Sequence, residues 1–234
     1  MQLHPTAGHG VAEALGRLCD LASLRQPDDE LLVRFLPRYY SELPEGDVDE
    51  RKLEDFYAVA VAHLALGRTR AAGQALVRVM SPDRERDGWH SPHSVALVVT
   101  DDMPFLVDTI RMVLDRHGLG IHLLVHPMLT VTRDDGHRLI DVHAVGEATG
   151  PIEAWTQIEI DRMDDVTAER VQADVLRAIE DVRRAVGDFD AMRKRMLDLA
   201  AADPILTWLA DGNFVFLGSA EYDLAPDGAL TLRT

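Results

Sequence analysis

Residues 94–100 (SVALVVT) limit the possible folds of this chain more than any other segment. The run is short, continuous, apolar and rich in β-branched side chains. A strand with one solvated face would alternate polar and apolar residues, whereas a strand covered on both faces does not. The run therefore predicts a β-strand that is buried on both faces.

The sequence after this strand alternates between helical and strand patterns. Residues 101–104 (DDMP) turn the chain into an amphipathic helix, and Pro127 interrupts a strand, so that strand should be an edge or carry a bulge there. The expected elements are a helix ending at Gly118, strands at 121–132, 138–144 and 155–160, and a helix over 165–187 that Gly187 bends or ends. Two helices on a small antiparallel sheet predict an α+β, ferredoxin-like βαββαβ domain.

The chain before and after this domain has a different character. Helical spacing over residues 10–67 predicts an N-terminal helical segment at 1–80, in which 76–80 is ambiguous between strand and helix. The polar run 81–88 predicts a linker to an α+β domain at 90–190. Residues 191–234 are expected to form a helical connector and a hairpin over 213–232. This hairpin either closes the sheet or begins a further domain.

The acidic composition of the chain argues against two classes of binding partner. The chain has 24 Lys and Arg against 40 Asp and Glu, a net charge of −16, which argues against nucleic acid and anionic membranes as partners. We find no apolar run near ~18 residues, and the single Cys19 excludes an internal disulfide. A cytoplasmic location is expected, with Cys19 as a structural thiol.

The histidines offer little catalytic chemistry. On a strand, His122 and His126 would lie about 13 Å apart, too far to share one metal ion, unless His143 from a neighbouring strand completed a site. His90 and His93 lie close together, without an evident carboxylate or thiolate partner. The sequence lacks the common nucleophile, nucleotide and zinc motifs. We predict no catalytic, cofactor or metal site, and keep a metal-dependent enzyme using the three strand histidines only as a third hypothesis.

One loop has the geometry of a binding site. In a βαβ unit, the turn after the first strand lies beside the free N–H groups of the following helix, which favour a carboxylate. Two acidic residues in that turn favour an ammonium group as well, so we expect an amino-acid effector. The candidate residues are Thr100, Asp101, Asp102, Met103 and Pro104. The alternative is a ligand-free loop in which Asp101 and Asp102 cap the helix.

Four separate motifs, in order, resemble the N-terminal region of the large NAD-specific glutamate dehydrogenases of bacteria. They are VTDDMPFLVDTI at 99–110, GLGIHLLVHP at 118–127, WTQIEIDR at 155–162 and WLADGNFVFLGSAEYDL at 208–224. The resemblance covers residues 95–224 in patches and is weaker before Ser81.

The resemblance implies that the βαββαβ fold is of the ACT type and that this region is regulatory. The catalytic residues of these enzymes, which oxidise L-glutamate to 2-oxoglutarate and ammonia with NAD, would lie downstream, so this fragment would hold neither NAD nor substrate. Its partners would be the rest of the polypeptide, a second copy of the domain and an amino-acid effector; a purely structural interaction module is the alternative. Two departures stand out. Phe105 replaces a glycine that ligand-binding ACT domains often carry, and no strand directly follows the 165–187 helix.

Overall fold

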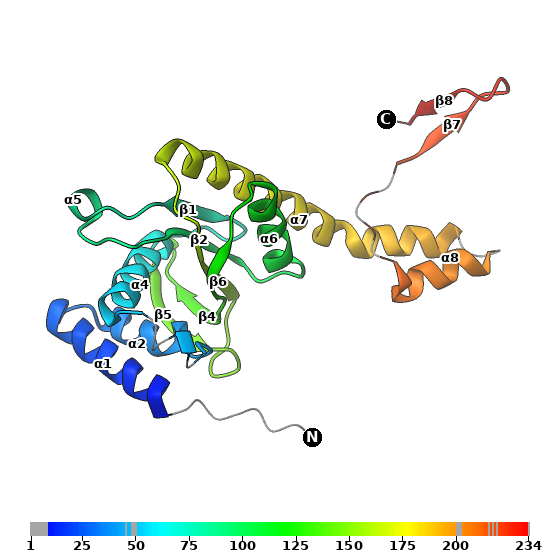
Figure 1. Ribbon diagram of the computed structural model, residues 1–234. Helices are drawn as coiled ribbons and strands as arrows, with labels where there is room; N and C mark the ends of the chain where they lie inside the picture. Colours follow the sequence, from blue (N-terminus) through cyan, green and yellow to red (C-terminus); the bar gives the residue numbers. More distant parts are fainter. Residues whose placement is uncertain are drawn as a thin grey trace. The chain divides into compact units, whose positions relative to one another are not determined.

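The computed structural model describes residues 9–44, 46–47, 51–199, 203–214, 216, 218 and 220–233. The chain divides into two compact units (Figure 1). The first unit contains residues up to 102 together with 106–178, and the second contains 103–105 and the residues from 179 onward.

The elements follow one another in an order close to the one predicted. Among the elements that the structure describes, the first unit begins with the helices α1 (His9–Arg25), α2 (Glu30–Tyr39) and α4 (Leu53–Gly67). They are followed by β1 (Leu76–Met80), α5 (Arg84–Asp87), β2 (Ser94–Asp101), α6 (Leu106–Arg116), β3 (Ile121–Val125), β4 (Met128–Arg133), β5 (Leu139–Ala144), β6 (Ile152–Ile160) and α7 (Asp165–Leu199).

The strands of the first unit form one antiparallel sheet with the order β1-β2-β6-β4-β5. β3 also pairs with β6, beside the C-terminal half of that strand, whereas β4 pairs with its N-terminal half. The chain breaks between β3 and β4 at Pro127, as predicted, and β4 and β5 form the expected hairpin. The fold class is therefore α+β and ACT-like, as the sequence predicted.

The sheet is completed by a strand from the N-terminal side. In a split βαβ arrangement the first and third strands lie in the centre, and the strand after the second helix pairs with the first. Here that edge is taken by β1, which pairs antiparallel with β2 from Leu76↔Val99 to Met80↔Val95. This placement settles the ambiguity at 76–80 and explains why no strand has to follow α7 directly.

Both faces of β2 are covered, as its sequence predicted: all of its residues except the last are buried. In Figure 1, α1, α2 and α4 lie on one side of the sheet, and α6 and α7 lie on the other. The first layer packs on Val99 and Trp155, which are cross-strand neighbours. The core there joins residues of α1, α2, α4 and the sheet: Leu18, Ala22, Leu32, Phe35, Leu36, Tyr39, Phe56, Ala60, Leu64, Leu129, Val131 and Val142.

Three local expectations had different outcomes. Gly118 adopts a φ of 68°, the left-handed conformation predicted for the end of α6. α7 continues as one helix through Gly187 to Leu199, so the expected break is absent. The polar run 81–88, predicted as a linker, joins β1 to β2, two paired strands of one sheet, and contains α5. The domain limits at 1–80, 90–190 and 191–234 stay a prediction.

The second unit contains the later part of α7, then α8 (Pro204–Trp208), the π-helical turn η2 (Leu209–Asn213), and the strands β7 (Tyr222–Leu224) and β8 (Leu230–Leu232). Asp203 caps α8, and Gly212 ends the turn with a φ of 87°. β7 and β8 pair with each other in a separate two-stranded sheet. Within the described strands, this hairpin therefore does not close the larger sheet.

The contact between Gly67 and Trp155 generates a prediction about stability. A Cβ at Gly67 would lie 2.7 Å from Cζ3 of Trp155, and the ring is buried. We expect Gly67→Ala to lower the free energy of unfolding by about 1–3 kcal/mol, because the added methyl overpacks the core. Urea unfolding measures this. Gly16→Ala is the control, since nothing lies near that helical position, and it should raise stability by about 0.5–1 kcal/mol. Equal losses from both variants would contradict the packing argument.

Candidate functional site

The predicted effector loop leaves the sheet at the end of β2. Thr100 is buried within the strand, and Asp101 is its last residue. Asp102 follows, with its backbone N–H donating to the carbonyl of Ile152 at 3.3 Å. Met103 and Pro104 are grouped with the second unit. Of the residues that follow Thr100 in this loop, only Asp101 and Asp102 therefore belong to the first unit.

Asp101 pairs with a buried arginine. Nη2 of Arg70 donates to its carboxylate at 2.7 Å, and Nη1 of Arg70 donates to Glu153 at 2.8 Å. Arg133 binds the same Glu153 carboxylate with two hydrogen bonds of 2.8 Å and donates to the carbonyl of Gly67 at 3.0 Å. The side chains of Arg70 and Glu153 are each 2% exposed. This set, which we call the Glu153 network, joins the end of β2 to β4, β6 and the end of α4.

The Glu153 network was not predicted from the sequence. Arg70 lies in an irregular stretch before β1, and Arg133 and Glu153 belong to different strands. Only the register of β4 and β6 brings these strands side by side, and no spacing pattern marks the three residues. Its members are held by mutual charge pairing, which is required when arginine and glutamate are buried.

Phe105 has an unusual backbone conformation. Its φ is 66°, in the left-handed region that glycine adopts without strain, and its side chain is 52% exposed. A non-glycine residue in such a conformation costs of order 1 kcal/mol. The backbone at this position is thus the one that the glycine expected there would adopt, although the chain carries a phenylalanine.

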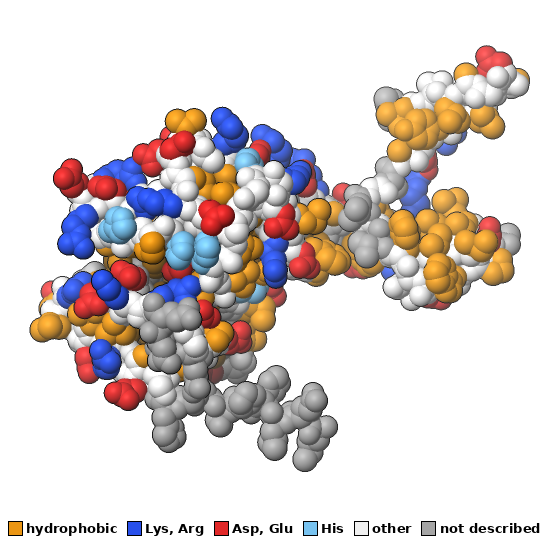
Figure 2. Space-filling model, in the orientation of Figure 1, with side chains coloured by type: hydrophobic (Ala, Val, Ile, Leu, Met, Phe, Trp, Pro, Cys, Tyr) orange, Lys and Arg blue, Asp and Glu red, His pale blue; other side chains and the backbone are white. Residues whose placement is uncertain are grey.

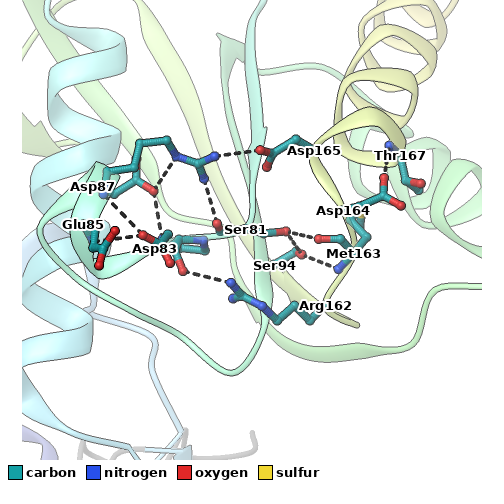
Figure 3. Close-up of polar contacts among 12 residues, drawn as sticks. Ser81, Asp83, Glu85, Asp87, Ser94, Arg162, Met163, Asp164, Asp165 and Thr167 are labelled. Atoms are coloured by element: carbon teal, nitrogen blue, oxygen red, sulfur yellow. Dashed lines mark hydrogen bonds and ion pairs between the residues drawn. The ribbon is translucent and has the colours of Figure 1, made fainter.

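A second polar cluster fastens the segment between β1 and β2 to the start of α7 (Figure 3). The hydroxyl oxygens of Ser81 and Ser94 lie 2.6 Å apart; Ser81 donates to the carbonyl of Met163 at 2.6 Å, and Ser94 accepts from its N–H at 3.0 Å. Arg86 donates to Asp165 at 2.8 Å and to the carbonyl of Ser81 at 2.9 Å. Both hydroxyls are used in structural bonds, so we assign this cluster no catalytic role.

The strand histidines each have a different polar neighbour. His122 lies 2.7 Å from a carboxylate oxygen of Asp161, His126 lies 2.7 Å from the hydroxyl of Thr156, and His143 lies 3.6 Å from Asp141. In the part of the chain that the structure describes, no three His, Cys, Asp or Glu residues are placed to hold a metal ion. The metal-enzyme hypothesis gains no support from this placement.

His90 and His93, which had no evident partner in the sequence, lie in different surroundings. The ring of His93 stacks on that of His122 with a centroid distance of 4.1 Å, and its Nδ1 is 3.6 Å from Glu159. Desolvation, followed by the charge of His122, lowers the pKa of His93. His90 remains exposed. The stacking could not be predicted from local sequence patterns, because β3 and the loop before β2 are distant along the chain.

His63 is a titratable group inside the core of the first unit. Its Nε2 lies 3.1 Å from the carbonyl of Val98, which can only accept, so Nε2 carries the proton and Nδ1 accepts from the hydroxyl of Tyr39 at 2.7 Å. Burial lowers the pKa of His63 to about 3. The imidazole is therefore neutral and acts as a bridge between α2, α4 and β2.

Cys19 lies partly buried on α1, and desolvation raises the pKa of its thiol. A raised thiol pKa disfavours the reactive thiolate, in keeping with a structural cysteine. Among the helices described, none is long and apolar enough to span a bilayer.

The first unit thus has an ACT-like sheet, a charged loop after its first central strand and a core with neutral or paired polar groups. The chain belongs to the family of the "Glutamate dehydrogenase, ACT1 domain", whose sequence model matches residues 35–175.

The relatives are NAD-specific glutamate dehydrogenases. The protein of Halomonas elongata is 34% identical over 213 residues, and that of Pseudomonas aeruginosa is 29% identical over 212; each alignment covers 82% of this chain and 13% of the relative. The protein of Mycobacterium tuberculosis is 28% identical over 182 residues, covering 69% of this chain and 11% of the relative. The chain thus matches only a small part of these proteins, and the resemblance seen in its motifs is confirmed.

The Glu153 network should be essential for stability. Glu153→Gln leaves Arg70 and Arg133 buried without a carboxylate between them, so we expect the free energy of unfolding to fall by about 3–5 kcal/mol. Glu30→Gln is the control, because Glu30 pairs with Arg34 but is 85% exposed, and its loss should not exceed about 1 kcal/mol. Urea unfolding of both variants is the measurement. A loss at Glu153 as small as at Glu30 would show that the network contributes little.

His63 should make stability depend on pH. The unfolded chain binds a proton at His63 near pH 6.5, whereas the folded chain stays neutral to about pH 3. Stability therefore falls as the pH decreases from 6.5 toward 3. From pH 7 to pH 5 we expect the wild-type chain to lose about 2 kcal/mol more than His63→Gln, measured by urea unfolding at both values. Parallel losses in the two chains would contradict a buried neutral imidazole.

Proposed function

We propose that this chain is a regulatory and assembly region of an NAD-specific glutamate dehydrogenase and holds no catalytic residues of its own. The complete enzyme is proposed to convert L-glutamate and NAD to 2-oxoglutarate, ammonia and NADH. Family membership supports the parent activity, and the small share of the relatives that the chain matches supports a non-catalytic part. NAD would bind outside this region, and the cytoplasm is the proposed compartment.

The observation that carries the regulatory proposal is the connection of the loop after β2 to the core. Asp101 shares Arg70 with buried Glu153, so a ligand that binds at the loop acts on a network reaching three other elements. A ligand shifts a conformational equilibrium only when it binds the two conformations with different affinity. Competition between the ligand and Asp101 for Arg70 would give the ligand a different affinity for the two conformations.

An amino acid remains the proposed effector for the loop Thr100–Pro104. Asp102 is exposed, and its carboxylate has no hydrogen bond or ion pair among the described residues, which leaves it available to an ammonium group. The carboxylate of the ligand would then pair with Arg70 in competition with Asp101, or with backbone N–H groups.

A purely structural role is the second candidate. The hairpin β7–β8 carries four exposed apolar side chains at paired positions, Tyr222 opposite Leu232 and Leu224 opposite Leu230. A two-stranded hairpin is marginal on its own in water, so these side chains favour contact with the rest of the polypeptide or with a second copy.

Calorimetric titration of the chain with each of the twenty amino acids tests the effector proposal. We expect at least one to bind, and Asp102→Asn to weaken that binding about tenfold or more through loss of a charged hydrogen bond. Asp115→Asn is the matched control on an exposed part of α6 and should bind as the wild type does.

The absence of heat for every amino acid at millimolar concentration would overturn the effector and leave the structural role. Loss of quaternary order in the complete enzyme on removal of residues 1–234 would support assembly, and unchanged order would overturn it.

A further inference from the structure

β5 forms the edge of the large sheet on the side away from β1. The backbone groups of every second residue of an edge strand point away from the sheet, where a strand of another molecule can bind them. At the pair Val131↔Val142, the N–H of Val131 donates to the carbonyl of Pro151 and so points away from β5. The two residues of such a pair turn their backbone groups either toward each other or apart, so Val142 points its groups outward, and so does Ala144 two residues later.

Two acidic residues cover these outward groups. The N–H of Ala144 donates to the carboxylate of Glu147 at 3.1 Å, and the carbonyl of Ala144 accepts from the N–H of Glu147 at 3.0 Å. The N–H of Val142 donates to the carboxylate of Asp141 at 2.9 Å. Asp141 and Glu147, which we call the edge carboxylates, thus occupy backbone groups that an added strand would have to bind.

Other outward groups of the sheet are covered as well. At the start of β5, the N–H of Leu139 donates to the carbonyl of Arg68 at 2.8 Å. At the opposite edge, the side-chain oxygen of Gln172 on α7 accepts from the N–H of Val79 on β1 at 2.9 Å. Contacts from distant segments therefore protect both edges of the sheet.

Two arginines of α2 hold the edge carboxylates in place. Arg34 donates to Asp141 at 2.9 Å, and Arg38 donates to Glu147 at 3.3 Å. These arginines lie one helical turn apart on α2, which packs against β5. The hydrogen bond from the N–H of Ala144, followed by that from Arg38, lowers the pKa of Glu147. The contact therefore favours the ionised carboxylate.

The sequence of β5 is itself suited to pairing. Residues 139–145 (LIDVHAV) are mostly apolar and include three β-branched side chains, and Asp141 is the one acidic residue among them. Ile140 in β5 and Val145 just after it are 47% and 49% exposed. By contrast, Figure 2 shows acidic and basic side chains interspersed over the face of the first unit in view, a composition that opposes association.

We propose that Asp141 and Glu147 close the outer edge of β5 against strand pairing, so that a second copy of the chain can extend the sheet only after these carboxylates are released. Two identical antiparallel edges can satisfy each other's backbone groups about a two-fold axis, which makes a second copy the matching partner. Because the arginines that hold the edge carboxylates both belong to α2, a displacement of this helix releases both carboxylates together. The closure is a property of the first unit and holds whether or not the complete enzyme assembles through this region.

Sedimentation equilibrium of the full chain tests the closure. The double variant Asp141→Ala, Glu147→Ala keeps β5 but frees its outward N–H groups, so we expect it to self-associate at least about tenfold more tightly than the wild-type chain. The matched control is Glu30→Ala, Asp115→Ala, which makes the same change in charge at exposed positions of α2 and α6. This control should associate as the wild-type chain does.

Amide hydrogen exchange locates the contact. In the wild-type chain the N–H of Ala144 should exchange slowly at every protein concentration, because Glu147 binds it. In the double variant this N–H should exchange faster when the protein is dilute and more slowly as the concentration rises, because β5 of a second copy then takes the place of Glu147.

Two results would overturn the proposal. One is association of the double variant no tighter than that of the control. The other is tighter association without slower exchange at Ala144, because the contact would then lie elsewhere, for example at the hairpin of β7 and β8. Unchanged circular dichroism shows that the variants fold. If the double variant unfolds, Glu147→Ala alone, with Glu30→Ala as its control, is held to the same two criteria.

Discussion

The burial of β2 on both faces is the constraint on which the first unit depends. A strand without a solvated side requires a layer of side chains above it and another below it, and it requires neighbours on both edges to satisfy its backbone. β6 and β1 supply the edges. The N-terminal helices supply one layer, and α6 with the start of α7 supplies the other. The helical segment before β1 is thus part of the same core as the sheet, although its sequence shows a separate pattern.

Burial also determines how polar groups are used. Arg70 and Glu153 lie inside the first unit because each compensates the charge of the other, and Arg133 completes the set. Buried ion pairs rarely add stability relative to apolar residues of similar size. A conformation in which one partner is missing is, however, strongly destabilised, because the other charge is then buried and unpaired. His63 follows the same rule in neutral form, with one nitrogen donating and the other accepting. The first set joins the end of β2 to β4, β6 and the end of α4, and the second joins α2, α4 and β2.

The sequence predicted what local patterns encode. The apolar run at 94–100, the strand patterns after it and the signals at Pro127 and Gly118 located the central strands and the helix between them. What it missed depends on pairing between distant segments. Nothing local distinguishes β1 as an edge strand or marks Arg70 as the partner of Glu153. Gly187 shows the opposite error, since a residue that weakens helices in isolation is tolerated in α7. Of the candidate site, the loop was located by its position after the first strand, whereas the edge carboxylates of β5 meet the arginines of α2 only in three dimensions.

The origin of β1 has a consequence for dissecting the protein. Relative to the usual split βαβ order, the first unit is circularly permuted: its outermost strand comes from ahead of the domain instead of from its tail. A shortened chain that starts in the polar run would lose β1 and expose the backbone edge of β2 from Val95 to Val99. Bare edges of this kind invite pairing between molecules and aggregation. An excised version of this domain must therefore retain its N-terminal residues through β1, whereas trimming the tail beyond α7 removes no strand from its sheet.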